Sequence, residues 1–214
     1  MAFVEPAVLP DAGAAPPVTS PANGAVLSLA AARETRVVVA VDAKLLPSVE
    51  VSLDGARARP LAILPETPKL SDLGELGEGE HYLVASLRSS PDLPAVRSVV
   101  RFGVGAPPSN GPLVFCSRPE GTVYAPADAK LLLDFVTDGF QPGKDGSVRV
   151  RIENARGGNV RFESLLTSPD ARQFTLPGSD DFALELSLLD VSGQPLRAKF
   201  ARDRCDVTRN EVTP

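Results

Sequence analysis

The stretch GEHYLVASL (Gly79–Leu87) decides the fold, because a polar turn there opens into alternating apolar and polar residues. A period of two residues is typical of a strand with one face in a core. A second stretch of this kind, SDDFALELSL (Ser179–Leu188), follows about 100 residues later. Each copy is followed by a turn-rich break and a last strand, which ends near Phe102 in the first copy and near Phe200 in the second. This repetition predicts two similar β units in succession.

Further landmarks recur in the same order and at nearly the same spacing. The pairs are Pro21–Gly24 with Pro119–Gly121; Val37, Val39 and Val41 with Leu131, Leu133 and Phe135; Val49, Val51 and Leu53 with Val148, Val150 and Ile152; and Tyr82 with Phe182. Chance periodicity would not keep this order, so we interpret the repeat as a duplication with loop insertions.

Composition is that of a folded chain rich in short elements. The 214 residues are 43% hydrophobic and allow two domains of ordinary size. The 21 Pro and 17 Gly fall between the apolar runs, as they do between short strands. The net charge of −5 argues against a nucleic-acid partner. No apolar run approaches the ~20 residues of a spanning helix, so we expect no membrane-spanning segment.

We expect four segments. Residues 1–17 are rich in Ala and Pro and predict a flexible tether that followed an export signal or a lipid anchor. Residues 18–104 form the first predicted sandwich, 105–112 a Pro-rich linker and 113–214 the second sandwich. Five Lys against seventeen Arg, with much Ala, Val, Leu and Pro, suggest a GC-rich bacterial genome.

Several local elements are predicted in the first unit. Arg36–Val41 is β-branched and predicts a buried central strand, and Asp54-Gly55 predicts a hairpin turn after the strand of Val49, Val51 and Leu53. Leu61–Leu64 is the candidate returning strand. Pro68–Leu76 predicts a helical turn, and Val96–Val104 predicts the closing strand.

The predicted architecture is all-β, with two consecutive antiparallel β-sandwich domains. Ser20-Pro21-x-x-Gly24, the Val-rich second strand, Val51–Gly55 and Leu76–Tyr82 resemble segments of bacterial immunoglobulin-like or fibronectin-III-like modules. The resemblance covers nearly the whole chain beyond the tether. The second unit departs from it, since Ser179–Phe182 lacks the Gly-x-His form. The Trp and intersheet Cys pair of antibody domains are also absent.

The resemblance bears on the two cysteines. In such sandwiches the first and last strands commonly run side by side, which implies that Cys116 and Cys205 meet in a disulfide. Closing a loop of roughly 90 residues would stabilise the unit by ~4–5 kcal/mol, and it implies an oxidising compartment. Two unpaired thiols and a two-thiol metal site remain alternatives.

The sequence argues against an enzyme. His81 is the only histidine, so His-dependent catalysis would have to use it, and we expect a structural, partly exposed side chain instead. Carboxylates such as Asp180, Asp181 and Asp203 form no spaced calcium loop, so we expect no metal and no cofactor. A small hydrolase, such as a paired-carboxylate glycosidase, is a remote alternative.

Arginines mark the one surface feature that differs between the repeats. Arg149 and Arg151 alternate with apolar residues, and Arg161 follows after a turn. Such a row could bind carboxylate or phosphate groups of an acidic polysaccharide or partner. The alternative is cross-strand pairing with Glu153 and Glu163.

The function that we expect is a non-enzymatic interaction or spacer module of the cell envelope, the cell surface or the secreted fraction. Its partner would be another envelope or secreted protein. Polysaccharide binding through the arginines is the alternative, although sugar platforms usually need exposed Trp or Tyr, and the chain has no Trp and two Tyr.

Overall fold

The computed structural model describes most of the chain as two compact units. The described residues are 15–56, 58–64, 68–87, 95–116, 122–124, 130–133, 135–154, 160–168, 172–175 and 182–209. Contacts divide the chain between Asn110 and Gly111. We call Asp11–Asn110 the N-terminal unit and Gly111–Pro214 the C-terminal unit, and each is taken by itself.

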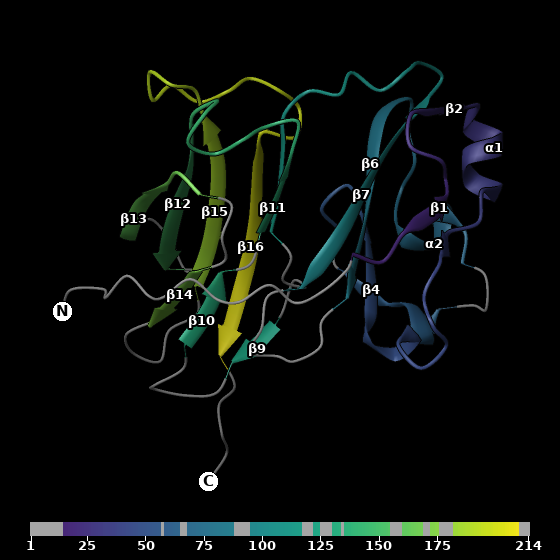
Figure 1. Ribbon diagram of the computed structural model, residues 1–214, viewed down its shortest axis with the longest axis horizontal. Helices are drawn as coiled ribbons and strands as arrows, with labels where there is room; N and C mark the ends of the chain where they lie inside the picture. Colours follow the sequence, from purple (N-terminus) through teal and green to yellow (C-terminus); the bar gives the residue numbers. More distant parts are fainter. Residues whose placement is uncertain are drawn as a thin grey trace, which may run out of the picture. The chain divides into compact units, whose positions relative to one another are not determined.

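A five-stranded sheet is the frame of the N-terminal unit (Figure 1). Its order is β5 (Arg59–Pro60), β4 (Val49–Leu53), β6 (Gly79–Leu87), β7 (Val96–Val104) and β2 (Ala25–Leu27). All neighbours are antiparallel except β2 and β7, which are parallel. The strands β6 and β7 have the bounds that the sequence predicts.

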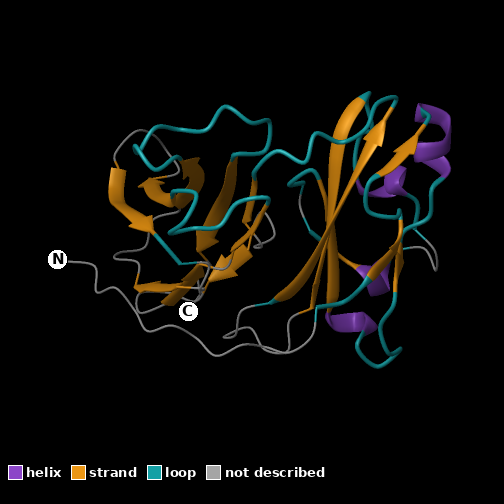
Figure 2. Ribbon diagram, turned by 45° about the horizontal axis from the view of Figure 1, so that its top comes forward, coloured by secondary structure: helices purple, strands orange, loops and turns teal. Residues whose placement is uncertain are grey.

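Short elements cover one side of this sheet. They are β1 (Val18–Ser20) paired with β3 (Val38–Val39), helices α1 (Leu29–Glu34) and α2 (Leu70–Leu73), and 3₁₀ turns Leu46–Ser48 and Leu61–Ile63. Figure 2 shows the helices together on one side of the long strands. Their apolar residues close a core with the sheet, whose fully or nearly fully buried members include Ala32, Leu70, Leu53, Leu83 and Phe102.

The C-terminal unit repeats the sheet. Its order is β13 (Val160–Leu166), β12 (Ser147–Asn154), β15 (Phe182–Leu189), β16 (Arg202–Arg209) and β9 (Thr122–Tyr124), with β9 parallel to β16. Two further pairs are β8 (Leu113–Cys116) with β11 (Phe135–Asp138), and β10 (Lys130–Leu133) with β14 (Arg172–Thr175). The core includes Val150, Ile152, Leu184, Leu186 and Cys116.

The two sheets share one strand order and one parallel pair at the same place, as a duplicated sequence predicts. The fold is therefore all-β and predominantly antiparallel, as expected. The ladders also correct one landmark. Leu53 pairs with Leu83 and Ile152 pairs with Leu184, so Phe182 corresponds to His81 and not to Tyr82. A slip of one residue moves a side chain to the other face of a strand.

Three local predictions are wrong. Within Arg36–Val41 only β3 is a strand, and it lies in a two-stranded pair with Val38 exposed. Leu61–Ile63 forms a 3₁₀ turn, and the returning strand is β5, two residues earlier. Phe200 lies in a turn before β16 begins. In each case an apolar run fills a turn or a short layer, which periodicity alone does not distinguish from a central strand.

The predicted hairpin turn at Asp54-Gly55 is present. The N–H of Ala56 donates to the carbonyl oxygen of Leu53, and both central residues have positive φ, +51° and +76°. This is the type I′ geometry that Asp-Gly favours between twisted strands. The turn places the Asp54 carboxylate beside β6.

Residues after β7 fold back onto the N-terminal unit. The N–H of Gly105 donates to the carbonyl oxygen of Leu27, and the hydroxyl of Ser109 donates to Glu80. A Cβ at Gly103 would lie 1.7 Å from the carbonyl oxygen of Ala106. These contacts attach most of the predicted linker segment to one unit. No helix in the described part of the chain is long and apolar enough to cross a bilayer.

Candidate functional site

The arginine-bearing strand of the C-terminal sheet has two distinct faces. Val148, Val150 and Ile152 of β12 are fully buried in the core. Arg149 and Arg151 alternate with them and therefore lie on the outer face of the sheet. This alternation is the period-two pattern read from the sequence.

Pairing with the neighbouring strands arranges the outer face in two rows. Residues directly opposite in an antiparallel ladder lie on one face, with their Cβ atoms about 5 Å apart. The Arg149 row contains Leu165, Arg149, Ser187 and Arg202. The Arg151 row contains Glu163, Arg151, Glu185 and Arg204.

Charges alternate along the Arg151 row. Arg151 stands between Glu163 and Glu185, and its Nε lies 2.8 Å from Oε1 of Glu153, although that N–H is not aligned for a hydrogen bond. Its side chain retains only 34% exposure. The positive charge of Arg151 therefore lies among carboxylates on the same face of the sheet, and its printed partner, Glu153, belongs to the same strand.

The Arg149 row differs because it contains no carboxylate. The Arg149 guanidinium makes no hydrogen bond or ion pair in the described part of the chain, and its Nε is buried without an acceptor. Ser187 is buried, and its hydroxyl lies 3.4 Å from Glu185. Arg202 pairs with the buried Glu185 of the other row, yet 68% of its side chain stays exposed. Among the described residues, this row therefore carries two arginines and no carboxylate of its own.

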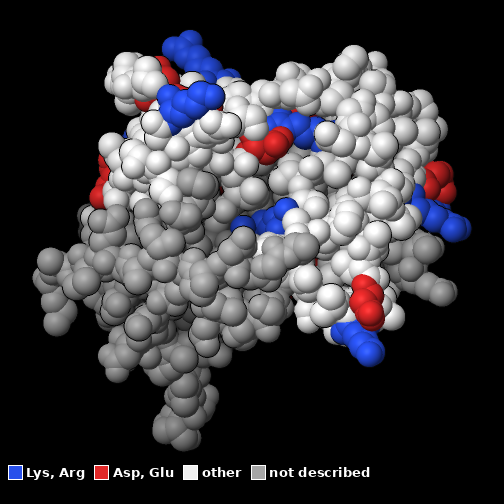
Figure 3. Space-filling model, viewed as in Figure 1, with Lys and Arg blue, Asp and Glu red and all other residues white. Residues whose placement is uncertain are grey.

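The third predicted arginine, Arg161, lies in β13 at a bulge. The register shifts there, so that Ile152 pairs with Phe162 and Glu153 pairs with Val160. The side chain of Arg161 lies outside the described residues, and we use only its backbone position. Figure 3 shows basic and acidic side chains dispersed on the face in view, without one large basic field.

His81 is buried, not partly exposed as the sequence predicts. Its Nδ1 lies 2.5 Å from Oδ2 of Asp54, its Nε2 lies 2.9 Å from the carbonyl oxygen of Gly77, and its ring stacks on Phe102. The other oxygen of Asp54 accepts the N–H of Tyr82. Nδ1 thus holds the turn after β4 against β6, and Nε2 holds the segment that precedes β6.

Cys116 and Cys205 lie on elements of one core. The Cys116 side chain is buried in the core cluster. Asp203, two residues before Cys205 on β16, accepts the N–H of Cys116 at 2.6 Å. Burial raises the pKa of Asp203 to about 6, although the N–H groups of Cys116 and Arg204 oppose the shift. Cys205 stands two residues after Asp203 in β16. Its side chain is outside the described residues.

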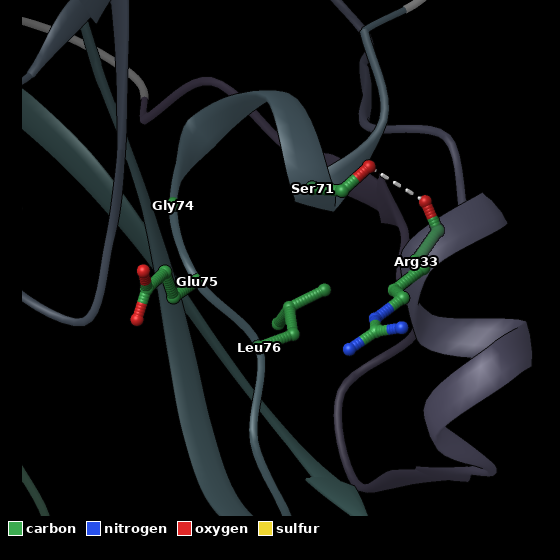
Figure 4. A pocket seen from close by; sticks show the side chains of 5 residues that line it. All are labelled: Arg33, Ser71, Gly74, Glu75 and Leu76. Carbon is green, nitrogen blue, oxygen red and sulfur yellow. Dashed lines mark hydrogen bonds between the residues drawn. The ribbon is translucent and has the colours of Figure 1, made fainter.

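A hollow of about 340 Å³ lies between α1 and α2. It is lined by Arg33, Ser71, Gly74, Glu75 and Leu76 (Figure 4). The hydroxyl of Ser71 donates to the carbonyl oxygen of Arg33 at 2.8 Å, and the Arg33 guanidinium extends beside Leu76 while Glu75 points away. The lining provides no pair of nucleophile and general base.

The carboxylates considered in the sequence have other roles or lie outside the described residues. Among those residues no three His, Cys, Asp or Glu side chains gather as metal ligands would. Asp203 binds backbone N–H groups, and Asp145 accepts the N–H of Gln141. Asp180 and Asp181 lie outside the described residues.

The sequence does not single out Leu165, Ser187 and Arg202. The alternation in β16 indicates which of its residues share a face, but the partners of a strand depend on register. The row therefore becomes visible only when β13, β12, β15 and β16 are aligned.

Comparisons with known proteins find little. No family model matches the chain, and no curated protein matches it. A solved structure of fibronectin(III)-like modules of Clostridium thermocellum CbhA is similar, with 15% identity over 92% of this chain and 96% of that chain, and a TM-score of 0.32. A TM-score of this size is too low to carry a conclusion about function.

Proposed function

We propose that the chain is a non-enzymatic interaction or spacer module that works outside the cytoplasm of a bacterium, in the envelope, at the cell surface or in the secreted fraction. The observation that carries the proposal is that His81, the chain's single histidine, is buried and has both ring nitrogens in contact with protein oxygen atoms. A side chain engaged in this way serves the fold and not acid–base chemistry.

Two other features support this proposal. The chain consists of two β units, an arrangement that suits presentation of surfaces or spacing of neighbours. Cys116 and Asp203 bring β8 and β16 together in a way that favours the Cys116–Cys205 disulfide, and such a bond belongs to an oxidising compartment.

Acidic polysaccharide binding through Arg149, Arg151 and Arg161 is the second candidate. It is favoured by the cationic Arg149 row. The alternating charges around Arg151 count against a broad polyanion surface, because Glu163 and Glu185 flank it on both sides.

A crosslinking pull-down from native envelope extract tests the proposal. The bait is the intact chain, and a variant with Arg149→Glu and Arg151→Glu is run beside it. Capture of a defined protein by the wild type supports an interaction module, and loss of that protein in the variant assigns the contact to the outer face. If no protein is captured, and the chain instead binds a sulfated polysaccharide column from which added salt releases it, the second candidate is favoured.

A further inference from the structure

The Arg149 row has the features of a docking surface. Arg149 and Arg202 stand on β12 and β16, with Ser187 of β15 between them. Neighbouring strands lie about 4.8 Å apart, so the two arginines start about 10 Å apart on either side of a small residue. Ser187 is small and buried between them. Arg202 binds Glu185 of the other row through Nη2, so its remaining N–H groups are the ones available to a ligand.

The Nε–H of Arg149 has no acceptor among the described residues. Its Nε is buried without a hydrogen bond, and none of its cross-strand neighbours, Leu165 and Ser187, is acidic. Buried polar groups in native proteins almost always have a partner, and an unpaired one calls for water, an ion or a ligand. A carboxylate is the group that a guanidinium binds best, through two parallel N–H donors.

An exposed leucine distinguishes the kind of partner. Leu165 is 56% exposed at the β13 end of the row, next to Arg149. An apolar side chain beside cationic ones fits a protein segment, which carries both acidic and apolar residues. It adds nothing to binding of a polysaccharide whose surface is polar throughout. Arginine anchors beside apolar contacts are also typical of protein interfaces.

We infer that the Arg149 row binds an extended protein segment with an acidic residue followed two positions later by an apolar residue. The acidic side chain lies above Ser187, between Arg149 and Arg202. Same-side residues of an extended segment are about 6.6 Å apart, so the apolar side chain falls between Arg149 and Leu165. This inference rests on the proposed function and names the contact surface for it.

The test uses the intact, ¹⁵N-labelled chain and a synthetic peptide, acetyl-Ala-Glu-Ala-Leu-Ala-amide, followed by NMR of backbone amides and arginine Nε–H groups. We expect saturable shifts at Arg149, Ser187 and Leu165. The peptide with Gln in place of Glu should bind at least about tenfold more weakly, because a charge-assisted hydrogen bond is lost.

Two arginines on one strand give a matched pair of variants. Arg149→Gln should lower the affinity for the peptide at least about tenfold. Arg151→Gln should change this affinity by less than about twofold, because Arg151 is already paired with Glu153. If Arg149→Gln does not fold, Leu165→Ser provides the second variant and should weaken binding several-fold. The amide spectrum of each variant shows whether the C-terminal sheet is intact.

Other outcomes overturn the inference. An equal loss of peptide affinity in Arg149→Gln and Arg151→Gln would show a diffuse charge effect. The absence of saturable shifts up to millimolar peptide would show that the row does not bind the peptide. Binding of dextran sulfate at this row without peptide binding would assign the row to polyanions. If wild type and Arg149→Gln capture the same envelope protein equally, the Arg149 row is not the contact surface, but the proposed function is still supported. Failure of the wild type to capture any protein would count against the proposed function itself.

Discussion

His81 and Asp54 form a part-buried contact in which Nδ1 lies 2.5 Å from Oδ2. The other ring nitrogen faces the carbonyl oxygen of Gly77 at 2.9 Å. The contact joins the turn after β4 to β6, and the second oxygen of Asp54 completes it by accepting the N–H of Tyr82.

A double-mutant cycle should measure this contact. Asp54→Asn keeps a residue that tolerates positive φ, and we expect it to cost ~1–3 kcal/mol because the buried His81 ring loses the carboxylate oxygen that it contacts. His81→Phe takes the residue that stands at the corresponding place in β15, Phe182. Adding Asp54→Asn to His81→Phe should then cost less than Asp54→Asn alone, with a coupling of ~1–2 kcal/mol.

Urea unfolding combined with hydrogen exchange of the β6 amides reports on the N-terminal unit alone. Strictly additive free energies would contradict the contact. Exchange of the β15 amides serves as the internal control, because β15 belongs to the other unit.

The places of the long strands could be predicted from their apolar runs, but β6 and β15 are buried on both faces and not on one, as a period of two predicts. The bounds predicted for β6 and β7 agree with the structure. Helix α1 was not predicted, although Ser28 is an N-cap whose hydroxyl accepts the N–H of Ala31 and three alanines follow. A helix of six residues spans fewer than two turns, so its apolar residues show no helical periodicity that could be distinguished from the strand pattern on either side.

The candidate site could be predicted only in part. Alternation in β12 placed Arg149 and Arg151 on the outer face, but it could not separate them. Their difference comes from register, which sets Arg151 between two glutamates and Arg149 beside Leu165 and Ser187. Register depends on pairing between distant segments, and no local signal in the sequence states it.

Asp203 should make the stability of the C-terminal unit depend on pH. Burial raises its pKa to about 6 from an ordinary 3.8. The folded state therefore favours the protonated acid, so stability is greatest at low pH and falls as the pH rises from about 4 to about 6. The difference corresponds to about 3 kcal/mol at most. Asp203→Asn should remove this dependence, as measured by urea unfolding between pH 4 and 7.5. An unchanged pH profile in this variant would show that another group is responsible.

Gly103 should not tolerate a side chain. A Cβ there would lie 1.7 Å from the carbonyl oxygen of Ala106, a backbone atom that cannot rotate away. We expect Gly103→Ala to displace the segment that follows β7 and to cost ~1–3 kcal/mol. Gly77→Ala is the matched control, because its Cβ would meet nothing within 4 Å. Hydrogen exchange at Gly105, whose N–H binds Leu27, reports the displacement. Equal stability of the two variants would contradict it.

The predicted pairing of Cys116 with Cys205 can be tested through thiols and stability together. Cys116 lies in the core, and Asp203 brings β16 to its backbone. A disulfide would close a loop of roughly 90 residues and restrict the unfolded chain, so its loss should cost ~4–5 kcal/mol, less any strain. Cys116→Ala, Cys205→Ala and the double variant should be about equally destabilised, and reduced wild type should match them. Two reactive thiols in unfolded, unreduced protein would contradict the pairing and weaken the case for an oxidising compartment.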